Sequence, residues 1–229
     1  MSPPVANGTG QPLLQLSQHS LAYQGQTVLT DVTLTIATGE KVALIGESGA
    51  GKSTLLKLLR SQQPQQSAYC PQHLGLVQPL SVFHNIYMGR LNRYSCWHNL
   101  RNLIYPTAER MAEIGALAAE LGIAGHLRHS VDRLSGGQQQ RTALGRALYQ
   151  QSPLFIGDEP VSSVDEYQAD ALLALINQRH STVVVALHDQ QLALKHYQRV
   201  IGLRAGRVVL DAPTDRLSST ELAAVYPQS

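Results

Sequence analysis

The sequence predicts an α/β fold with a mainly parallel sheet, an N-terminal antiparallel β subdomain and an inserted helical subdomain. In the second half of the chain, expected helices and strands alternate, which is typical of a parallel sheet with helices on its faces. Residues 13–36 alternate loosely between apolar and polar on both sides of a turn signal, Gly25-Gln26, which indicates an antiparallel strand pair. Residues 81–150 give expected helices and no strand, which indicates a helical lobe within the sheet.

The first half of the chain opens with a polar tail, residues 1–12, which we expect to be disordered. Apolar periodicity and cap or turn residues then define each element. Strands are expected at Leu13–Tyr23, Thr27–Ile36, Lys41–Ile45 and Ser67–Cys70. Helices are expected at Lys52–Arg60, at Ser81–Arg90 with Ser81 as N-cap, around Trp97–Leu103 within Asn92–Tyr105, and from Pro106 in the first turn to Leu121 before Gly122.

The second half follows a connector, Gly125–Arg133, and carries the alternation that defines the sheet. Helices are expected at Gly137–Gln150, Asp165–Arg179, Gln190–His196 and Ser218–Val225. Strands are expected at Leu154–Gly157 and Thr182–Leu187, with a strand pair at Val200–Leu203 and Val208–Leu210 around Gly206.

Composition narrows the possible partners. The net charge of +2 gives no argument for a nucleic-acid partner. The two cysteines, Cys70 and Cys96, match no metal-binding spacing, so we expect free thiols. We find no signal peptide and no apolar run near the ~20 residues that span a bilayer. The expectation is a soluble chain whose membrane role, if any, comes through a partner.

The stretch Gly46–Thr54 fits the phosphate-loop pattern G-x-x-x-x-G-K-[ST], between an apolar strand and the start of a helix. Its glycines let backbone N–H groups surround phosphate oxygens at a helix N-terminus. Lys52 is expected to reach the β- and γ-phosphates, and Ser53 to bind Mg²⁺. The sequence therefore predicts a P-loop NTPase core that binds a nucleotide and Mg²⁺, which kinases, GTPases, helicases and transport ATPases all share. The nucleotide-binding residues expected from this loop are Gly46, Ser48, Gly49, Ala50, Gly51, Lys52, Ser53 and Thr54.

Two carboxylates, Asp158 and Glu159, follow the apolar residues Leu154–Ile156. Ligands of a parallel sheet bind beyond the carboxyl ends of its strands, so both side chains are expected near the phosphate loop. We expect Asp158 to hold Mg²⁺, directly or through water, and Glu159 to polarise the attacking water as general base. In isolation, an exposed Asp-Glu-Pro turn would be the simpler interpretation.

The octapeptide Leu134–Arg141, Leu-Ser-Gly-Gly-Gln-Gln-Gln-Arg, opens a helix with two glycines. Ser-Gly-Gly alone would indicate an ordinary helix cap, but the whole octapeptide resembles the signature motif of ATP-binding-cassette (ABC) ATPases. The resemblance implies that two copies pair head to tail as a homodimer. It also implies that the start of this helix completes the ATP site of the opposite protomer. The residues concerned are Ser135, Gly136, Gly137 and Gln138.

The same resemblance assigns further roles along most of the chain. Tyr23 lies where the family places an aromatic ring against adenine. Gln72 resembles the glutamine that senses Mg²⁺ and the attacking water, with Gln78 as a weaker candidate. Ser162–Asp165 resembles the loop that crosses the dimer interface, and His188 resembles the histidine that contacts the γ-phosphate. The implied domain is residues 13–229, with a helical subdomain of about residues 80–150 in its core.

A finer resemblance, carried by residues 85–91, Trp97 and residues 187–208, is to the phosphonate-importer subgroup. It implies an ATP-hydrolysing subunit at the cytoplasmic face of the bacterial inner membrane. Its partners would be a membrane permease and, indirectly, a periplasmic binding protein. An exporter, a lipoprotein-release system and a soluble nucleotide-gated protein remain alternatives. One departure from the family is the short segment from Lys52 to Gln72, 72 − 52 = 20 residues, which lacks a β-hairpin usual there.

Overall fold

The computed structural model describes residues 10–23 and 25–226, with only the backbone of Tyr23 and Ser219. Most of the predicted disordered tail, residues 1–9, lies outside the described residues. The strands are β1 (Pro12–Tyr23), β2 (Gln26–Ala37), β3 (Lys41–Ile45), β4 (Ser67–Cys70), β5 (Leu154–Asp158), β6 (Thr182–Ala186), β7 (Arg199–Arg204) and β8 (Arg207–Pro213). The helices are α1 (Lys52–Gln62), α2 (Val82–Tyr87), α3 (Cys96–Ile104), α4 (Ala108–Glu120), α5 (Gly136–Tyr149), α6 (Glu166–Arg179), α7 (Gln190–His196) and α8 (Ser219–Ala223).

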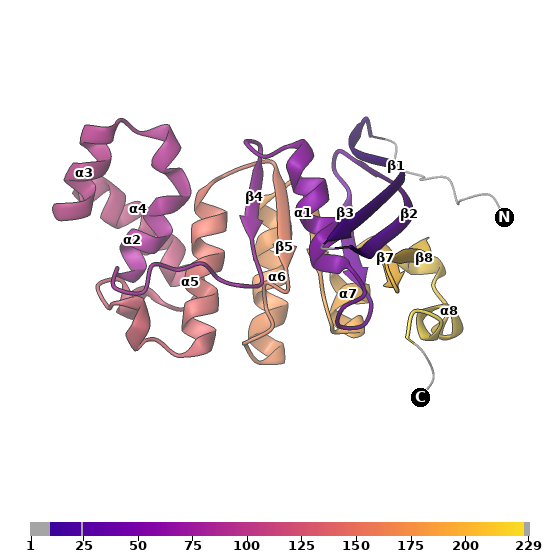
Figure 1. Cartoon of the computed structure of the whole chain (residues 1–229). Coiled ribbons are helices and arrows are strands. Elements are labelled where there is room, and N and C mark those ends of the chain that lie inside the picture. The colour runs from indigo at the N-terminus through magenta and orange to yellow at the C-terminus, as the bar shows by residue number, and fades with distance from the viewer. Residues whose placement is uncertain (1–9, 24, 227–229) are drawn as a thin grey trace.

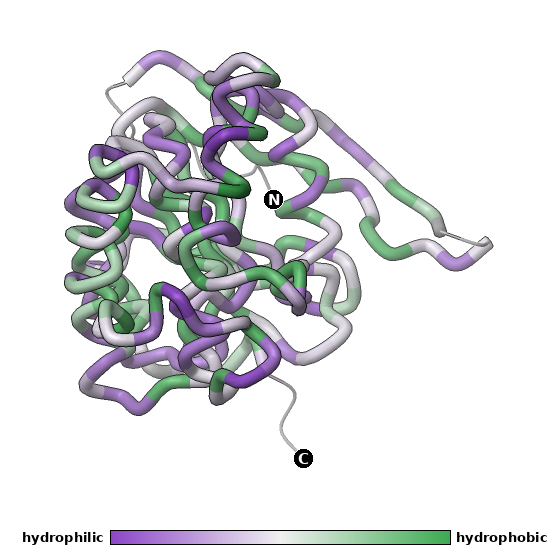
Figure 2. The backbone as a smooth tube through the Cα atoms, turned by 90° about the vertical axis from the view of Figure 1, so that its left-hand side faces the viewer, coloured by the Kyte–Doolittle hydropathy of each residue, from purple (hydrophilic) through white to green (hydrophobic). Residues whose placement is uncertain are grey.

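The strands form two sheets, and the predicted fold class is confirmed. β1 and β2 make a two-stranded antiparallel sheet, whose far end projects from the body (Figure 2). The second sheet has six strands in the order β4-β5-β6-β3-β7-β8. Its first five strands run parallel, and β8 pairs antiparallel with β7. Figure 1 shows α2, α3 and α4 at one end of the molecule and the β1–β2 hairpin near the other.

Strand alternation divides the core between the two faces of the large sheet. Val42 and Leu44 of β3 pack with α1 and the β1–β2 hairpin. Ala43 and Ile45, which point to the opposite face, pack with helices α2 and α4 to α7. Strands β5 and β6 are buried along their whole length, as expected for parallel strands covered on both faces. The free ends of these strands are therefore the part of the sheet that remains available to a ligand.

The helices α2 to α5, which we call the helical lobe (residues 82–149), lie in the chain between β4 and β5. These two strands are direct neighbours in the sheet, paired parallel from Ser67–Leu154 to Cys70–Gly157. The lobe therefore leaves the sheet at the carboxyl end of β4 and returns at the amino end of β5. Phe83 and Ile86 of α2 and Leu144 of α5 are fully or almost fully buried in the core that joins the lobe to the sheet.

Two helix predictions in the lobe are wrong in detail. The expected single helix Ser81–Arg90 is α2, capped by Ser81, followed by a 3₁₀ segment at Met88–Arg93 with a kink at Arg90. The cause is that the Arg90 side chain is buried, with its guanidinium 4.1 Å from the centre of the Tyr149 ring. Pro106 is not in the first turn of α4, because the Thr107 hydroxyl caps that helix by accepting from the Arg110 N–H.

The 3₁₀ segment also depends on Gly89. A Cβ atom at residue 89 would lie 2.3 Å from the Arg146 carbonyl oxygen of α5, a contact that only backbone movement could relieve. We predict that Gly89→Ala lowers the free energy of unfolding by about 1–3 kcal/mol through overpacking. The measurement is chemical denaturation followed by circular dichroism.

Gly125→Ala is the matched control, because no atom lies within 4 Å of a Cβ built at residue 125. Its stability should stay within about 0.5 kcal/mol of the unsubstituted chain. Equal stability of the two variants would contradict the close approach of residue 89 to α5.

Candidate functional site

The phosphate loop joins β3 to α1 in a conformation that its glycines permit. Gly46 has φ +146° and Gly51 has φ +102°, both in the region that favours glycine. A Cβ on Gly46 would lie 2.2 Å from the Leu203 carbonyl oxygen. Gly51 caps α1 without a side-chain acceptor, so the first N–H groups of α1 remain free for an anion. The loop can adopt this conformation because glycine occupies both positions, where a larger residue would be strained in φ and crowded by neighbouring atoms.

Lys52 is 5% exposed, and its ammonium is held inside the loop. Nζ donates to the Gly46 carbonyl at 2.6 Å and to the Glu47 carbonyl at 3.0 Å. Burial lowers the Lys52 pKa, and the negative charges of Glu159 and Asp158 partly oppose that shift. The ammonium is therefore positioned before any ligand arrives.

A cavity of about 200 Å³ opens beside the loop. Its lining residues are Val28, Ser48, Gly49, Gly51, Lys52, Ser53, Thr54, Gln72 and Glu159. The structure thus places Gln72 in this cavity. Gln78, the other candidate, is absent from the lining, and its carbonyl accepts from the Ser130 hydroxyl at 2.9 Å. Gly46 and Ala50 belong to the loop but do not line the cavity.

Asp158 ends β5 as a carboxylate that is 3% exposed. Its Oδ1 atom has no hydrogen-bond partner among the described residues. Burial raises the pKa of this carboxyl, and the neighbouring Ser53 hydroxyl and Lys52 ammonium act in the opposite direction. A buried, unpartnered carboxylate oxygen beside a hydroxyl fits an oxygen-seeking cation such as Mg²⁺.

Glu159 follows in a backbone conformation that is rare for its type, with φ +54°. Its N–H donates to the Ala186 carbonyl at 3.1 Å. Its carboxylate Oε1 lies 2.6 Å from Nε2 of His188, whose side chain is 52% exposed. Asp189 follows His188 and caps α7 by accepting from two backbone N–H groups. The ends of β5 and β6 therefore bring Glu159 and His188 together at the cavity edge.

The structure also reveals a site residue that the sequence reasoning missed, Gln140 of α5. This side chain is 4% exposed. Its Nε2 donates to the Glu159 carbonyl at 2.7 Å, and its Oε1 accepts from the Ser163 N–H at 3.1 Å. Gln140 therefore fixes the backbone on both sides of the Glu159–Ser163 turn. Three consecutive glutamines open α5, so no sequence signal singles out the one that points inward.

The signature stretch lies at the start of α5, outside the cavity of the same chain. Ser135 and Gly136 are exposed. The Ser135 hydroxyl accepts from the Gln138 N–H, and the Gln138 side chain accepts from the Ser135 N–H at 3.0 Å, which completes a capping box. A Cβ on Gly137 would lie 2.8 Å from the Ser163 carbonyl oxygen. These residues thus form an ordered helix start that faces solvent.

One expected site residue cannot be placed, because the Tyr23 side chain lies outside the described residues; its backbone ends β1. Val28 of β2 was not expected and lines the cavity. No pattern in the sequence marks Val28, because its approach depends on how the β1–β2 hairpin packs on the large sheet.

A phosphate loop, an Asp-Glu strand end and an exposed signature stretch thus occur together on one parallel sheet. The sequence model of ABC transporters matches residues 29–162, more than half of the chain. The chain belongs to the ABC transporter family, as one of its ATPase subunits.

Known relatives and solved structures agree with this family assignment. The phosphonates import ATP-binding protein PhnC 2 of Pseudomonas aeruginosa is 40% identical over 231 residues, covering 88% of this chain and 86% of that protein. The PhnC protein of Pseudomonas putida is 40% identical over 237 residues, covering 90% and 87%. An ATP-binding subunit of an ABC transporter superposes with TM-score 0.75 at 24% identity, covering 93% of this chain and 98% of that one. A dimeric bacterial ABC transporter cassette gives TM-score 0.74 at 24% identity, covering 88% and 99%.

The two structural likenesses establish the shared fold of ABC cassettes. Across the part of the chain that the structure describes, no helix is both long and apolar enough to cross a membrane.

We predict that Gln140→Leu lowers the kcat of this ABC ATPase about 10- to 100-fold. The reason is that the Glu159 carbonyl and the Ser163 N–H would lose their hydrogen-bond partner, which costs about 1–3 kcal/mol and would let Glu159 move from its position. The measurement is steady-state ATP hydrolysis, with KM expected to change little.

Gln139→Leu is the matched control on the same helix, because Gln139 donates to the Leu134 carbonyl and not to the turn at Glu159. An unchanged kcat in Gln140→Leu, or an equal loss in both variants, would contradict a positioning role for Gln140.

Proposed function

We propose that this chain is the ATP-hydrolysing subunit of a bacterial ABC importer for phosphonate or a related oxyanion. In this proposal it acts at the cytoplasmic face of the inner membrane, bound to a separate permease. A periplasmic binding protein would deliver the solute to that permease. The assignment of the solute is supported by the identity with phosphonates import ATP-binding proteins of Pseudomonas.

The observation that carries the catalytic part is the convergence of Lys52, Gln72 and Glu159 on one cavity. Lys52 and the free N–H groups of α1 would neutralise the phosphate chain of ATP. Glu159, held by Gln140 and by the Ala186 carbonyl, would orient water and accept its proton. His188 hydrogen-bonds the same carboxylate in this structure and would turn toward the γ-phosphate when ATP is bound.

Mg²⁺ would be held by Asp158, Ser53 and Gln72. When bound, it would neutralise charge on the β- and γ-phosphates. The fit rests on the buried, unpartnered Oδ1 atom of Asp158.

The site of one chain contains no residue from the signature stretch, and Ser135 and Gly136 are exposed. We therefore propose a head-to-tail homodimer, in which Ser135, Gly136, Gly137 and Gln138 of each copy close over the ATP of the other. A bacterial ABC cassette of the same fold has been solved as a dimer. In the proposed site, Tyr23 would stack on adenine.

The test is co-expression with the candidate permease, followed by reconstitution of the complex in proteoliposomes. ATP hydrolysis should rise when the matching binding protein is loaded with a phosphonate. A complex that forms but responds to a different solute would contradict the phosphonate assignment and leave the importer assignment intact. Absence of any permease in a pull-down from detergent-solubilised membranes would contradict the importer assignment.

A further inference from the structure

Helix α3 presents apolar side chains to water and polar side chains to the protein. Of nine exposed large apolar side chains in the described residues, five lie in or directly after this helix. We call them the α3 patch: Trp97, 81% exposed; Leu100, 48%; Leu103, 48%; Ile104, 60%; and Tyr105, 76%. The spacing of Trp97, Leu100 and Ile104 places them on one helix face. A surface helix with this orientation indicates a binding face.

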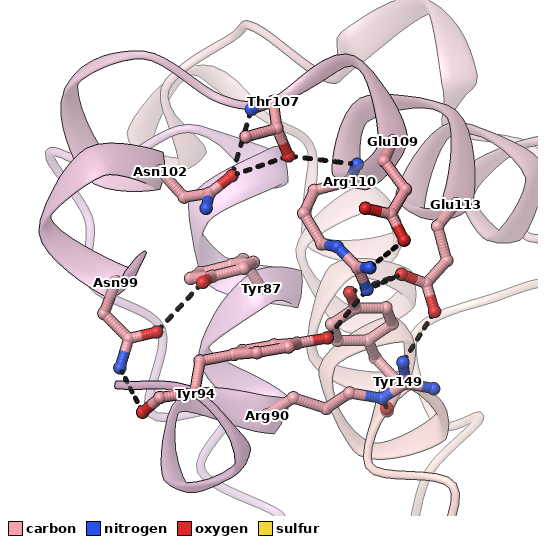
Figure 3. Close-up of polar contacts among 10 residues, drawn as sticks. All are labelled: Tyr87, Arg90, Tyr94, Asn99, Asn102, Thr107, Glu109, Arg110, Glu113 and Tyr149. Atoms are coloured by element: carbon pink, nitrogen blue, oxygen red, sulfur yellow. Dashed lines mark hydrogen bonds and ion pairs between the residues drawn. The ribbon is translucent and has the colours of Figure 1, made fainter. Parts of the chain in front are cut away.

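The inward face of α3 is polar, and its two asparagines, Asn99 and Asn102, are hydrogen-bonded (Figure 3). Asn102 is completely buried, and its side-chain oxygen accepts from the Thr107 N–H at 3.0 Å. Asn99 donates to the Leu91 carbonyl at 3.0 Å and accepts from the Tyr87 hydroxyl at 2.9 Å. These hydrogen bonds fix the rotation of the helix, so the patch is held outward and cannot turn into the core.

The charge around the patch is net positive, because the acidic side chains that follow it, Glu109 and Glu113, are both ion-paired with Arg110. No Asp or Glu occurs from Ser48 to Ala108. Arg101 of α3 and Arg93, three residues before α3 begins, are both exposed, and the Arg93 guanidinium also donates to the Gln150 carbonyl. A second copy of this chain would bring like charges together, which opposes self-association through this face. What binds the patch must therefore have an apolar region that the side chains can enter and a negatively charged surface beside it.

The chemistry of the patch matches a membrane surface. Aliphatic residues lie between Trp97 in the first turn and Tyr105 at the C-cap, and these two aromatic types are enriched at membrane–water interfaces. Arginines beside an apolar helix face are typical of helices that lie in an anionic lipid interface. Figure 1 shows α3 at one extremity of the molecule, where a flat surface can reach it.

We propose that the α3 patch inserts into the anionic lipid surface of the membrane at which the transporter works. The proposal rests on the proposed function only in placing the chain at a membrane. Its test is independent of the catalytic site, because α3 contributes no residue to the ATP cavity.

The chain contains a single tryptophan, Trp97, which lies within the patch and reports on it directly. The experiment adds vesicles of equimolar phosphatidylglycerol and phosphatidylcholine to the full chain and records tryptophan emission and co-sedimentation. We expect a blue shift and sedimentation with these vesicles, and neither with pure phosphatidylcholine. Arg93→Gln and Arg101→Gln should each weaken binding about fivefold.

Leu100→Ser combined with Ile104→Ser should weaken binding more than about tenfold. Val209→Ser is the matched control, because Val209 is an exposed apolar residue of β8, distant from α3 in Figure 1. Wild-type ATP hydrolysis in solution confirms that each variant is folded. Solvent-like Trp97 emission with anionic vesicles would overturn the proposal. So would emission that shifts only when the chain is bound to its permease, which would assign the patch to a protein contact.

Discussion

Glu159→Gln should retain ATP binding and stop turnover. The amide keeps the size of the side chain, so the contact with His188 and the cavity shape should persist. It cannot accept a proton from water, and loss of a general base lowers the rate about 10²- to 10⁴-fold. We expect kcat to fall by that factor in steady-state hydrolysis. The variant should also form a dimer with ATP, detectable by size-exclusion chromatography, because the nucleotide is no longer consumed.

Glu166→Gln provides the control, because it makes the same chemical change at an exposed residue in the first turn of α6. Its kcat should stay near that of the unsubstituted chain. Hydrolysis at the normal rate in Glu159→Gln would remove Glu159 from the role of general base and direct attention to His188.

Lys52→Ala should abolish most of the affinity for ATP. The ammonium is already buried between two loop carbonyls, so a bound phosphate chain would gain a positioned charge without reorganisation. Loss of one partner of a buried charge pair corresponds to about 2–5 kcal/mol, which is at least about a 30-fold rise in Kd. Isothermal titration calorimetry with a non-hydrolysable ATP analogue measures this directly.

Lys57→Ala tests whether any cation on α1 has the same effect, because Lys57 lies on the same helix and is exposed. Its Kd should change less than about threefold, as expected for a screened surface charge. Similar losses in the two variants would mean that general electrostatic attraction, and not the buried ammonium, determines ATP affinity.

Much of this fold could be predicted because its signals are local. The strands β3, β5 and β6 are short apolar runs, and each expected strand was within one or two residues of its observed bounds, except β8, which extends further at its end. The helical lobe was harder to predict, because its elements depend on distant contacts. The 3₁₀ segment after α2 exists because Arg90 is drawn toward Tyr149, 59 residues further along the chain.

The residues of the candidate site also fall into those that local sequence could predict and those that depend on distant contacts. Lys52 could be predicted from the phosphate loop between β3 and α1, and Glu159 from the Asp-Glu pair at the end of β5. Each of these motifs lies within one short stretch of the chain. Gln140 could not be predicted, because its importance depends on which of three neighbouring glutamines points inward at the Glu159–Ser163 turn. Gln72 and Gln78 could be separated only when the end of β4 was placed beside the phosphate loop.

The attachment of the helical lobe has a mechanical consequence. The chain leaves the sheet at the carboxyl end of β4 and re-enters at the amino end of β5. Because these neighbouring strands are parallel, the two junctions lie at opposite ends of the strands. Between these junctions the lobe packs on the sheet through Phe83, Ile86 and Leu144, so a rotation about the line that joins the junctions must repack that apolar contact. Gln72 lies two residues beyond the first junction. A ligand that pulls Gln72 inward would therefore apply torque to the whole lobe, and Ser135 would travel on an arc with that line as its pivot.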